Sequence, residues 1–349
     1  MSNHLTLHIV SSIPYSNLNR DDSGTPKRIM QGGVQRSVLS SQSIKRGIRL
    51  AYQNSTGDIA IRSGQFSKIV AQRVCEINPS IDEQEALKKV KPIIENLTGK
   101  EAKEGEERKK VSSFISAEEI ETLAQSVAAD LDDTNFIKGH VTGSLLIAAF
   151  GRMFANKPEH DTEAGLSVSP AVTTHGSVIS TDYFTAVDDI SDKGSTFLGV
   201  NQLTSGVFYR TISIDKKQLN RSWSGVDSEN AHELLSALVD ACIYGLPSGK
   251  KNSTAPYTLP AIVFAEEQRC RIAYDFETPV QPSYDGGFMD ATIDSLEKQV
   301  KTAHEFDPHN FEGLNIVSGV HDKASSGFGD AKYVSKSELC DRVATWALN

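Results

Sequence analysis

The residues with the clearest chemical potential lie in one short basic segment near the start of the chain. Residues 20–49 contain two acidic residues, Asp21 and Asp22, and seven basic ones: Arg20, Lys27, Arg28, Arg36, Lys45, Arg46 and Arg49. This segment therefore carries a charge of +5, although the whole chain of 349 residues carries −9. Lysine and arginine neutralise phosphates, so the segment could hold a polyanion that the rest of the surface repels. The distribution favours one defined nucleic-acid track.

The end of the basic segment has the pattern of a helix with two different faces. Ser40 or Ser41 can cap a helix over residues 41–53. At 3.6 residues per turn, one face of this helix carries mainly apolar side chains: Ile44, Ile48, Ala51 and Tyr52. The opposite face carries polar and basic ones: Gln42, Lys45, Arg46 and Arg49. One side is suited to a core and the other to anions, and the free N–H groups at the helix start also favour phosphate.

The same residues allow other roles. The pair Asp21-Asp22 could ligate a metal ion and cut RNA, or one of its members could orient Arg20 or cap a turn, which is the role we expect. A basic helix face is also common on ordinary solvated surfaces. The sequence has no phosphate-binding loop, nucleophile elbow or H-E-x-x-H motif. We therefore expect a protein that is not an enzyme and that needs no cofactor or metal.

These side chains must be positioned by a fold that mixes strands and helices. Alternating patterns predict strands near residues 5–13, 34–39, 141–150, 166–174, 207–214 and 261–276. Helical patterns predict helices over residues 41–53, 228–244 and 337–348, a helical insertion over 54–139, a hairpin-like excursion over 178–208 and a glycine-rich loop over 313–329. This order indicates an α+β fold of the ferredoxin-like type with two insertions.

Composition excludes several other classes of protein. Hydrophobic residues make up 38% and charged residues 23%, as in an ordinary globular protein. No apolar run is long enough to cross a membrane, and the uncharged residues 1–19 lack the basic region of a signal peptide, so we expect a cytoplasmic protein with no membrane partner. Four cysteines far apart in the sequence predict reduced, mostly buried thiols.

Several ordered blocks of sequence resemble the CasC family, which supplies the backbone subunit of the type I-E CRISPR surveillance complex Cascade. They are Leu18-Asn19-Arg20-Asp21-Asp22, Gly32-Gly33 with Arg36, Ser40-Ser41-Gln42-Ser43-Ile44-Lys45-Arg46, Gly151-Arg152-Met153, Thr173-Thr174-His175, the block from Asp182 through Phe184 and Thr185 to Asp189, and Ser205-Gly206-Val207-Phe208-Tyr209-Arg210. They are spread over the first two-thirds of the chain. The helical insertion and the last hundred or so residues resemble the family only in order and length.

The resemblance implies a right-hand shape. A palm similar to an RNA-recognition motif (RRM-like) would comprise residues 1–53, 140–176 and 207–349, with helical fingers at 54–139 and a β-hairpin thumb at 177–206. It also implies a homo-oligomer in a prokaryotic ribonucleoprotein of antiviral defence. Copies would stack along the guide RNA (crRNA) with other Cascade subunits, and each thumb would press on the RNA of its neighbour. The guide would then pair with target DNA.

Carried over position by position, the resemblance gives a set of RNA-binding residues. Backbone contacts would come from Ser40, Gln42, Lys45, Arg46 and Arg49, with Arg20 and Lys27 along the path, Met153 as a wedge and Phe184 and Thr185 at the thumb. Hydroxyl, amide and cationic groups on phosphates read no sequence, as a subunit that accepts any guide requires. Met and Phe offer apolar surfaces that tolerate any unstacked base. Without the resemblance, core packing would be the expected role of Met153 and Phe184.

The sequence departs from the family at one point and leaves two other functions open. Some relatives hold duplex DNA with a lysine-rich helix at the end of the fingers. In this chain the corresponding residues 131–140 contain a single lysine, Lys138. Lys103, Lys109 and Lys110 could serve instead. Some distant backbone subunits cut target RNA, so an RNA-cleaving subunit that uses Asp21 or Asp22 is the main alternative. A scaffold that binds only proteins is the other.

Overall fold

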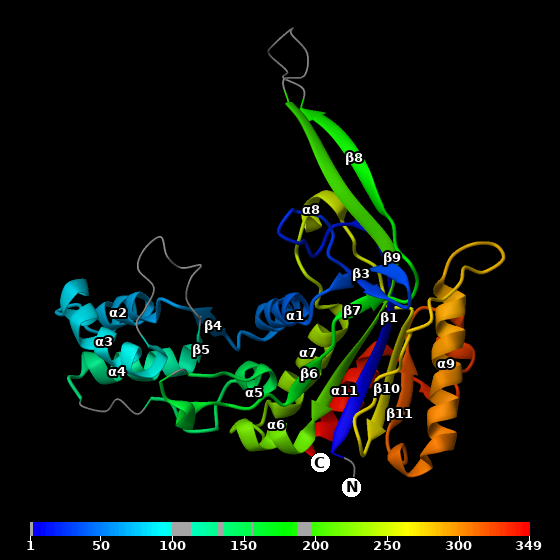
Figure 1. Ribbon diagram of the computed structural model, residues 1–349. Coiled ribbons are helices and arrows are strands. Elements are labelled where there is room, and N and C mark those ends of the chain that lie inside the picture. Colours follow the sequence, from blue (N-terminus) through cyan, green and yellow to red (C-terminus); the bar gives the residue numbers. More distant parts are fainter. Residues whose placement is uncertain (1–2, 100–112, 132–135, 155, 187–196) are drawn as a thin grey trace. The chain divides into compact units, whose positions relative to one another are not determined.

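The largest feature of the computed structural model is a ten-stranded sheet that is mostly antiparallel (Figure 1). The structure describes residues 3–99, 113–131, 136–154, 156–186 and 197–349. The strand order is β12-β11-β10-β1-β9-β7-β3-β2, and β6 and β8 also pair with β9. Only the short pair of β11 with β12 within that path is parallel among the pairs with described registers. The predicted mixture of strands and helices is confirmed.

The elements follow one another along the chain in a mixed order. The strands are β1 (His4–Ser16), β2 (Arg28–Gln31), β3 (Val34–Leu39), β4 (Ala60–Ser63), β5 (Ser113–Ser116), β6 (Leu166–Val168), β7 (Ala171–Thr173), β8 (Ile179–Ala186), β9 (Phe197–Asp215), β10 (Ile262–Gln268), β11 (Asn315–Ser318) and β12 (Lys332–Tyr333). The helices are α1 (Ser41–Thr56), α2 (Phe66–Ile77), α3 (Glu83–Thr98), α4 (Ala117–Ala128), α5 (Leu145–Phe150), α6 (Lys216–Ser222), α7 (Ala231–Tyr244), α8 (Lys251–Thr254), α9 (Met289–Phe306), α10 (Asp322–Ser326) and α11 (Lys336–Leu348). Short 3-10 turns lie at Pro158–His160 and Pro308–Asn310.

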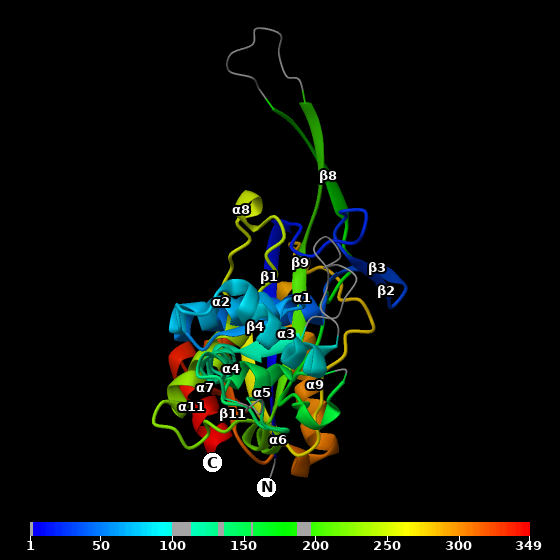
Figure 2. The same cartoon turned by 90° about the vertical axis from the view of Figure 1, so that its left-hand side faces the viewer.

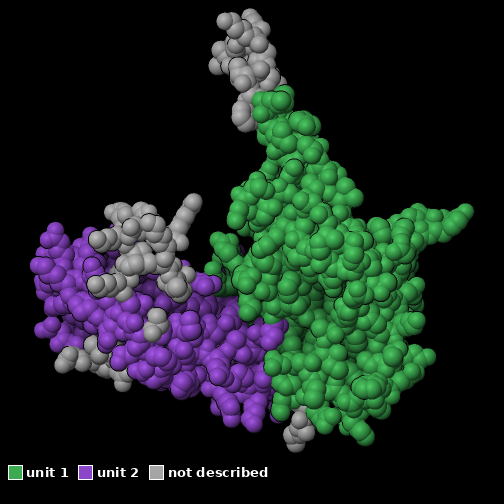
Figure 3. Space-filling view, in the orientation of Figure 1, with its two compact units in different colours: residues 1–51, 168–213, 238–343 green, residues 52–167, 214–237, 344–349 purple. Residues whose placement is uncertain are grey.

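The chain divides into two compact units, which Figure 3 colours separately. Unit 1 contains residues 1–51, 168–213 and 238–343, with most of the large sheet. Unit 2 contains residues 52–167, 214–237 and 344–349, with α2, α3 and α4. The boundaries that we predicted for palm, fingers and thumb stay predictions.

In unit 1, β1 is a central strand and helix α9 packs on one face of the sheet (Figure 1). Side chains on both faces of β1 are buried, since Leu7, Ile9 and Val10 have at most 1% of their surface exposed. The core beneath α9 joins Val10 to Ile293 and to the other apolar residues of α9, β10 and β11: Leu296, Val300, Ile262, Phe264 and Val317. The polar residues Thr6 and His8, which alternate with Leu5, Leu7 and Ile9, are buried as well.

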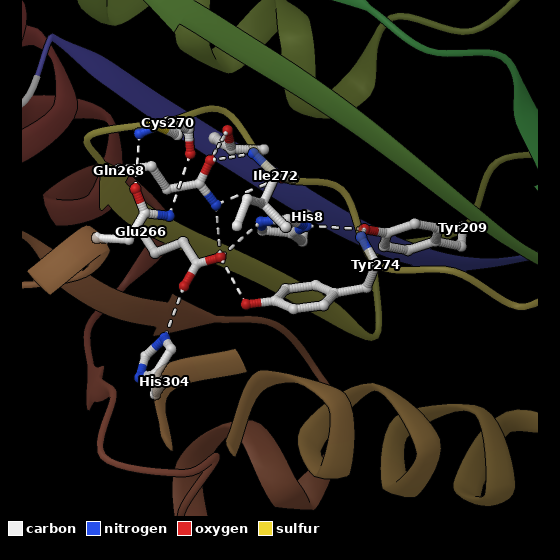
Figure 4. A network of polar contacts seen from close by, with 10 residues as sticks. His8, Tyr209, Glu266, Gln268, Cys270, Ile272, Tyr274 and His304 are labelled. Atoms are coloured by element: carbon white, nitrogen blue, oxygen red, sulfur yellow. Dashed lines mark hydrogen bonds and ion pairs between the residues drawn. The ribbon is translucent and has the colours of Figure 1, made fainter. Parts of the chain in front are cut away.

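A buried polar network crosses the core between β1, β10 and α9 (Figure 4). The carboxylate of Glu266 accepts hydrogen bonds from Tyr274 Oη and Gln268 Nε2, both at 2.8 Å. Its Oε1 lies 3.0 Å from His8 Nε2, and its Oε2 lies 2.9 Å from His304 Nε2. Although burial raises the pKa of Glu266, the contacts with His304 and His8 offset that effect and hold the pKa at about 2. The network fastens α9 to the sheet.

In unit 2, helices α2, α3 and α4 pack around their own apolar cluster, which includes Val70, Val90, Leu123 and Phe154. Helix α3 is capped by Asp82, and α4 begins with a capping box between Ser116 and Glu119. These helices confirm that the predicted insertion is helical. A two-stranded sheet, β4 with β5, was not predicted.

Three predicted elements need correction, and one helix was missed. The expected strand at residues 141–150 is wrong, because Leu145–Phe150 forms helix α5. A short buried apolar run has no period that separates a strand from a helix. Only Ile262–Gln268 of residues 261–276 is a strand, and the supposed loop at 313–329 contains β11 and α10. Helix α9 was not predicted.

The predictions on membranes and cysteines can also be compared with the structure. Within the described residues, none of the helices is both long and apolar enough to span a membrane. All four cysteines are free thiols. Cys242 and Cys340 are buried as expected, Cys75 is half-buried, and Cys270 is exposed.

Candidate nucleic-acid interface

Helix α1 has the two faces that the sequence predicts. Ile44, Ile48 and Tyr52 are fully buried. On the other side, Gln42 and Arg46 are exposed, and Lys45 and Arg49 are half-buried. Partial burial lowers the pKa of the Lys45 ammonium below its ordinary value. The helix therefore rests on an apolar face and presents cations on the other, as a phosphate-binding element requires.

The loop that carries Arg20 and Lys27 is tied to the start of α1. Lys27 N donates to Asn19 O at 2.9 Å, and an isolated bridge joins Arg20 to Pro26. The side chain of Asn19 then accepts from the backbone N–H of Ser40 at 2.7 Å and from Ser43 Oγ at 3.2 Å. Arg20 and Lys27 are both exposed. The structure thus brings the two loop cations and the basic face of α1 together on unit 1.

Ser40 is the helix cap, which confirms one of the two predicted alternatives. Its Oγ accepts from Ser43 N at 3.4 Å, and it donates to Ser43 Oγ at 3.1 Å. The single hydroxyl proton of Ser40 is therefore already used within the turn. To donate to a phosphate, the Ser40 hydroxyl would have to give up its hydrogen bond to Ser43 Oγ.

Arg36 is not part of the exposed basic surface. It is 1% exposed, and its guanidinium donates to Glu277 O at 2.8 Å and Thr173 O at 3.3 Å. Burial lowers its pKa, although Asp275 and Glu277 favour the charged form. The local charge of +5 thus overstates the number of cations that a ligand could reach.

Asp21 has a structural role in the same loop. Its Oδ1 accepts from Ser23 N, Ser23 Oγ and Thr25 N at 2.7–3.0 Å. These hydrogen bonds, with that from the Ser23 side chain as the strongest, lower the pKa of Asp21. The carboxylate stabilises the turn, which is the role we expected for one member of the Asp21-Asp22 pair.

The predicted hairpin is present as β8 and β9, which extend well beyond the rest of the sheet in both views (Figures 1 and 2). Residues 187–196, which join the two strands, lie outside the described residues. Phe184 pairs with Gly199, and Thr185 pairs with Leu198. Since neighbouring side chains point to opposite faces of a strand, Phe184 and Thr185 cannot contact a base from the same side.

The face that carries Phe184 is built around a glycine. A Cβ on Gly199 would lie only 2.2 Å from Phe184 Cζ and 2.5 Å from Cε1, so the ring lies across the backbone of its partner. The ring keeps 42% of its surface exposed. Thr185 lies on the other face, with three exposed apolar side chains: Tyr183, Leu198 and Val200. Sequence reasoning missed Gly199, because its role depends on the register between two strands.

Met153 belongs to unit 2, where both of its neighbours are fixed. Arg152 is buried and forms an ion pair with Glu119, with Nη1 2.7 Å from Oε2. Phe154 is fully buried and its N–H donates to Asp161 Oδ1 at 2.6 Å. Met153 itself is 67% exposed. It is therefore held outward as an apolar projection, which excludes the core-packing role that its sequence alone would favour.

Unit 1 carries two additional cations that sequence reasoning did not assign to the site. Lys250 donates to Asn201 Oδ1 on the hairpin, and Lys251 lies 5.1 Å from the ring centroid of Tyr257. The two adjacent lysines after Gly249 were the only feature of the sequence that could have indicated these cations as part of the site. Lys103, Lys109 and Lys110, which we considered for duplex DNA, lie outside the described residues. Across the described residues, no group of three metal-ligating side chains occurs.

Comparison with known proteins identifies a family and a shared fold. The model of a family described as CT1975-like protein matches residues 5–344. A chain of a "CRISPR RNA-guided surveillance complex, pre-nicking" is 26% identical, with a TM-score of 0.83 over 99% of this chain and 100% of that chain. A chain of another "CRISPR RNA-guided surveillance complex" has the same fold, with 21% identity and a TM-score of 0.75 over 98% and 99%. No curated protein matches the chain.

Proposed function

Because the chain belongs to the CT1975-like protein family, we propose that it is a guide-RNA-binding subunit of a CRISPR surveillance complex. The observation that carries the proposal is the arrangement of α1, in which exposed Gln42 and Arg46 and half-buried Lys45 and Arg49 cover a buried apolar face. These groups would bind phosphates without reading bases. Phe184 and Met153 would supply surfaces for unstacked bases.

The finer part of the proposal follows the sequence blocks shared with the CasC family. We propose a type I-E backbone subunit with an RRM-like palm in a right-hand arrangement, of which several copies assemble along the crRNA with other subunits. The exposed apolar face of the hairpin supports this view, since Tyr183, Leu198 and Val200 would be covered by a neighbouring copy. The guide held in this way would pair with a target DNA strand.

We also propose that the subunit is not catalytic. The support is the turn in which Asp21 accepts from Ser23 and Thr25, which accounts for its carboxylate without a metal ion. Assembled complex should leave complementary RNA intact in the presence of magnesium. Regularly spaced cuts that disappear in Asp21→Ala would instead establish the RNA-cleaving alternative.

The main test measures the salt dependence of RNA binding. In Lys45→Ala/Arg49→Ala, the slope of log K against log salt should flatten by about 1.4, because each phosphate contact to a single strand contributes about 0.7. The matched control is Lys298→Ala/Lys301→Ala, which removes two exposed cations from α9. An unchanged slope in the first variant would refute the assigned phosphate contacts. Purified protein with no bound RNA would favour the protein scaffold.

A further inference from the structure

Three glycines hold one connecting segment of unit 1 tightly against two elements of the proposed RNA surface. A Cβ on Gly47 in α1 would lie 2.4 Å from Leu246 O, and a Cβ on Gly245 would lie 2.6 Å from Ile48 Cα. A Cβ on Gly249 would lie 2.4 Å from Leu18 O. No side chain fits at these contacts. The segment that follows α7 is therefore fixed between α1 and the residues that precede Arg20.

Lys250 follows directly and reaches the hairpin. Its backbone has a φ of 48°, in the left-handed region that costs a non-glycine residue about 1 kcal/mol or more. Its ammonium donates to Asn201 Oδ1. Asn201 lies two residues after Gly199 on β9, so both occupy the hairpin face that carries Phe184. This contact uses one of the three N–H groups of the Lys250 ammonium, so two remain as donors for a ligand. Asp182 is the cross-strand neighbour of Asn201.

Lys251 and Tyr257 form the outer part of the same loop. Both are exposed, and the ammonium lies 5.1 Å from the ring centroid. The loop is closed by Thr258 Oγ1, which donates to Ser12 O, and Ala255 is also left-handed with a φ of 42°. Within the described part of the chain, no salt bridge involves Lys250 or Lys251.

We infer that the loop at residues 249–257 is a second RNA contact, in which Lys250 and Lys251 bind two neighbouring backbone phosphates and Tyr257 packs against an adjacent ribose or base. This inference rests on the proposed function. It follows from position, because residues 245–246 just before the loop pack on α1, Gly249 packs on Leu18 beside the Arg20 loop, and Lys250 binds the hairpin face of Phe184. One strand that crosses α1 and reaches Phe184 would pass this loop. The Lys251 ammonium beside the exposed ring of Tyr257, with the Lys250 ammonium on the preceding residue, suits a nucleotide.

The test titrates a labelled single-stranded RNA with the purified full chain at several salt concentrations. Lys250→Ala/Lys251→Ala should flatten the salt slope by about 1.4, from two lost phosphate contacts at about 0.7 each. Lys250→Arg/Lys251→Arg should keep the slope, since arginine also pairs with phosphate. If the double alanine variant fails to fold, Lys251→Gln alone should flatten the slope by about 0.7, because Lys251 is exposed.

The outcomes separate this inference from the proposed function. If Lys45→Ala/Arg49→Ala flattens the slope while Lys250→Ala/Lys251→Ala behaves like the α9 control Lys298→Ala/Lys301→Ala, the loop is not an RNA contact and the proposed function stands. If no variant changes the slope, both ideas fail. An unchanged slope combined with loss of assembly between copies would show that the loop binds protein instead.

Discussion

The ring of Phe184 lies over the backbone of Gly199, its cross-strand partner in the hairpin. A Cβ on Gly199 would lie 2.2 Å from Phe184 Cζ, so this orientation of the ring exists only because the partner has no side chain. An aromatic ring over a cross-strand glycine also shields the exposed backbone of the strand. One face of Phe184 is thus occupied by the hairpin, and the ring remains 42% exposed.

We predict that Gly199→Ala weakens RNA binding only through Phe184. The new methyl group would displace the ring and remove much of a stacking contact worth about 1–3 kcal/mol per base. The measurement is a double-mutant cycle of RNA affinity with Phe184→Ala. Gly199→Ala should have little further effect once Phe184 is absent. Equal losses in both backgrounds would show that Gly199 acts independently of the ring.

A second prediction separates Met153 from its neighbour Arg152. Arg152→Met should lower the free energy of unfolding by about 3–5 kcal/mol, because it leaves Glu119 buried without its partner. Met153→Ala should change stability by less than about 0.5 kcal/mol, because that side chain is exposed. Urea denaturation measures both changes.

RNA affinity provides the complementary readout for this pair. If the Met153 side chain wedges against bases, Met153→Ala should bind RNA more weakly than the wild type although its stability is unchanged. A Met153→Ala variant that is strongly destabilised would show that the side chain packs in a core. One that binds RNA as the wild type does would remove Met153 from the interface.

Two arginines of the basic segment should respond in opposite ways. Arg36→Ala should destabilise the protein by at least about 1.5–3 kcal/mol, because it removes buried hydrogen bonds from a charged group to Glu277 O and Thr173 O. Arg46→Ala should leave thermal stability nearly unchanged and flatten the salt slope of RNA binding by about 0.7. Thermal unfolding and RNA titration of both variants give the comparison. The reverse pattern would contradict the assignment of buried and exposed cations.

The buried carboxylate of Glu266 predicts a pH dependence of stability. Its pKa of about 2 is below the ordinary value of 4.5, so the folded state binds its proton less readily than the unfolded state. Its contribution, about 3 kcal/mol from the shift at about 1.36 kcal/mol per pH unit, is present above pH 4.5 and is lost as the pH falls toward 2.

Urea denaturation at pH 5, 4 and 3 measures this contribution against Glu266→Gln, which cannot titrate. The wild type should be more stable than the variant at pH 5, and the difference should shrink as the pH falls. A difference that stays constant over this range would mean that the loss in Glu266→Gln comes from packing and hydrogen bonds rather than from proton binding.

Local patterns were sufficient to predict the elements that carry most of the candidate interface. The helical phase of residues 41–53 predicted the buried and exposed faces of α1, because amphipathic spacing is a property of consecutive residues. The helical insertion was predicted from the same kind of spacing, and the hairpin from local strand patterns, and both are present in the structure. The sequence blocks shared with a known family identified Met153 and Phe184 as candidate RNA contacts, although their apolar side chains alone suggested core packing.

The tertiary structure decided which of those side chains are available and what holds them. Arg36 and Arg46 have the same chemistry in the same basic segment, and only packing against residues far away in sequence buries the first and leaves the second in solvent. Residues 145–149 of helix α5 are all buried. Its sequence therefore shows no apolar–polar period that would distinguish a helix from a strand. Gly199 and Lys250 gain their positions from strand register and from contacts across the fold. The local sequence therefore determined the basic face of α1, but only long-range contacts determined what surrounds it.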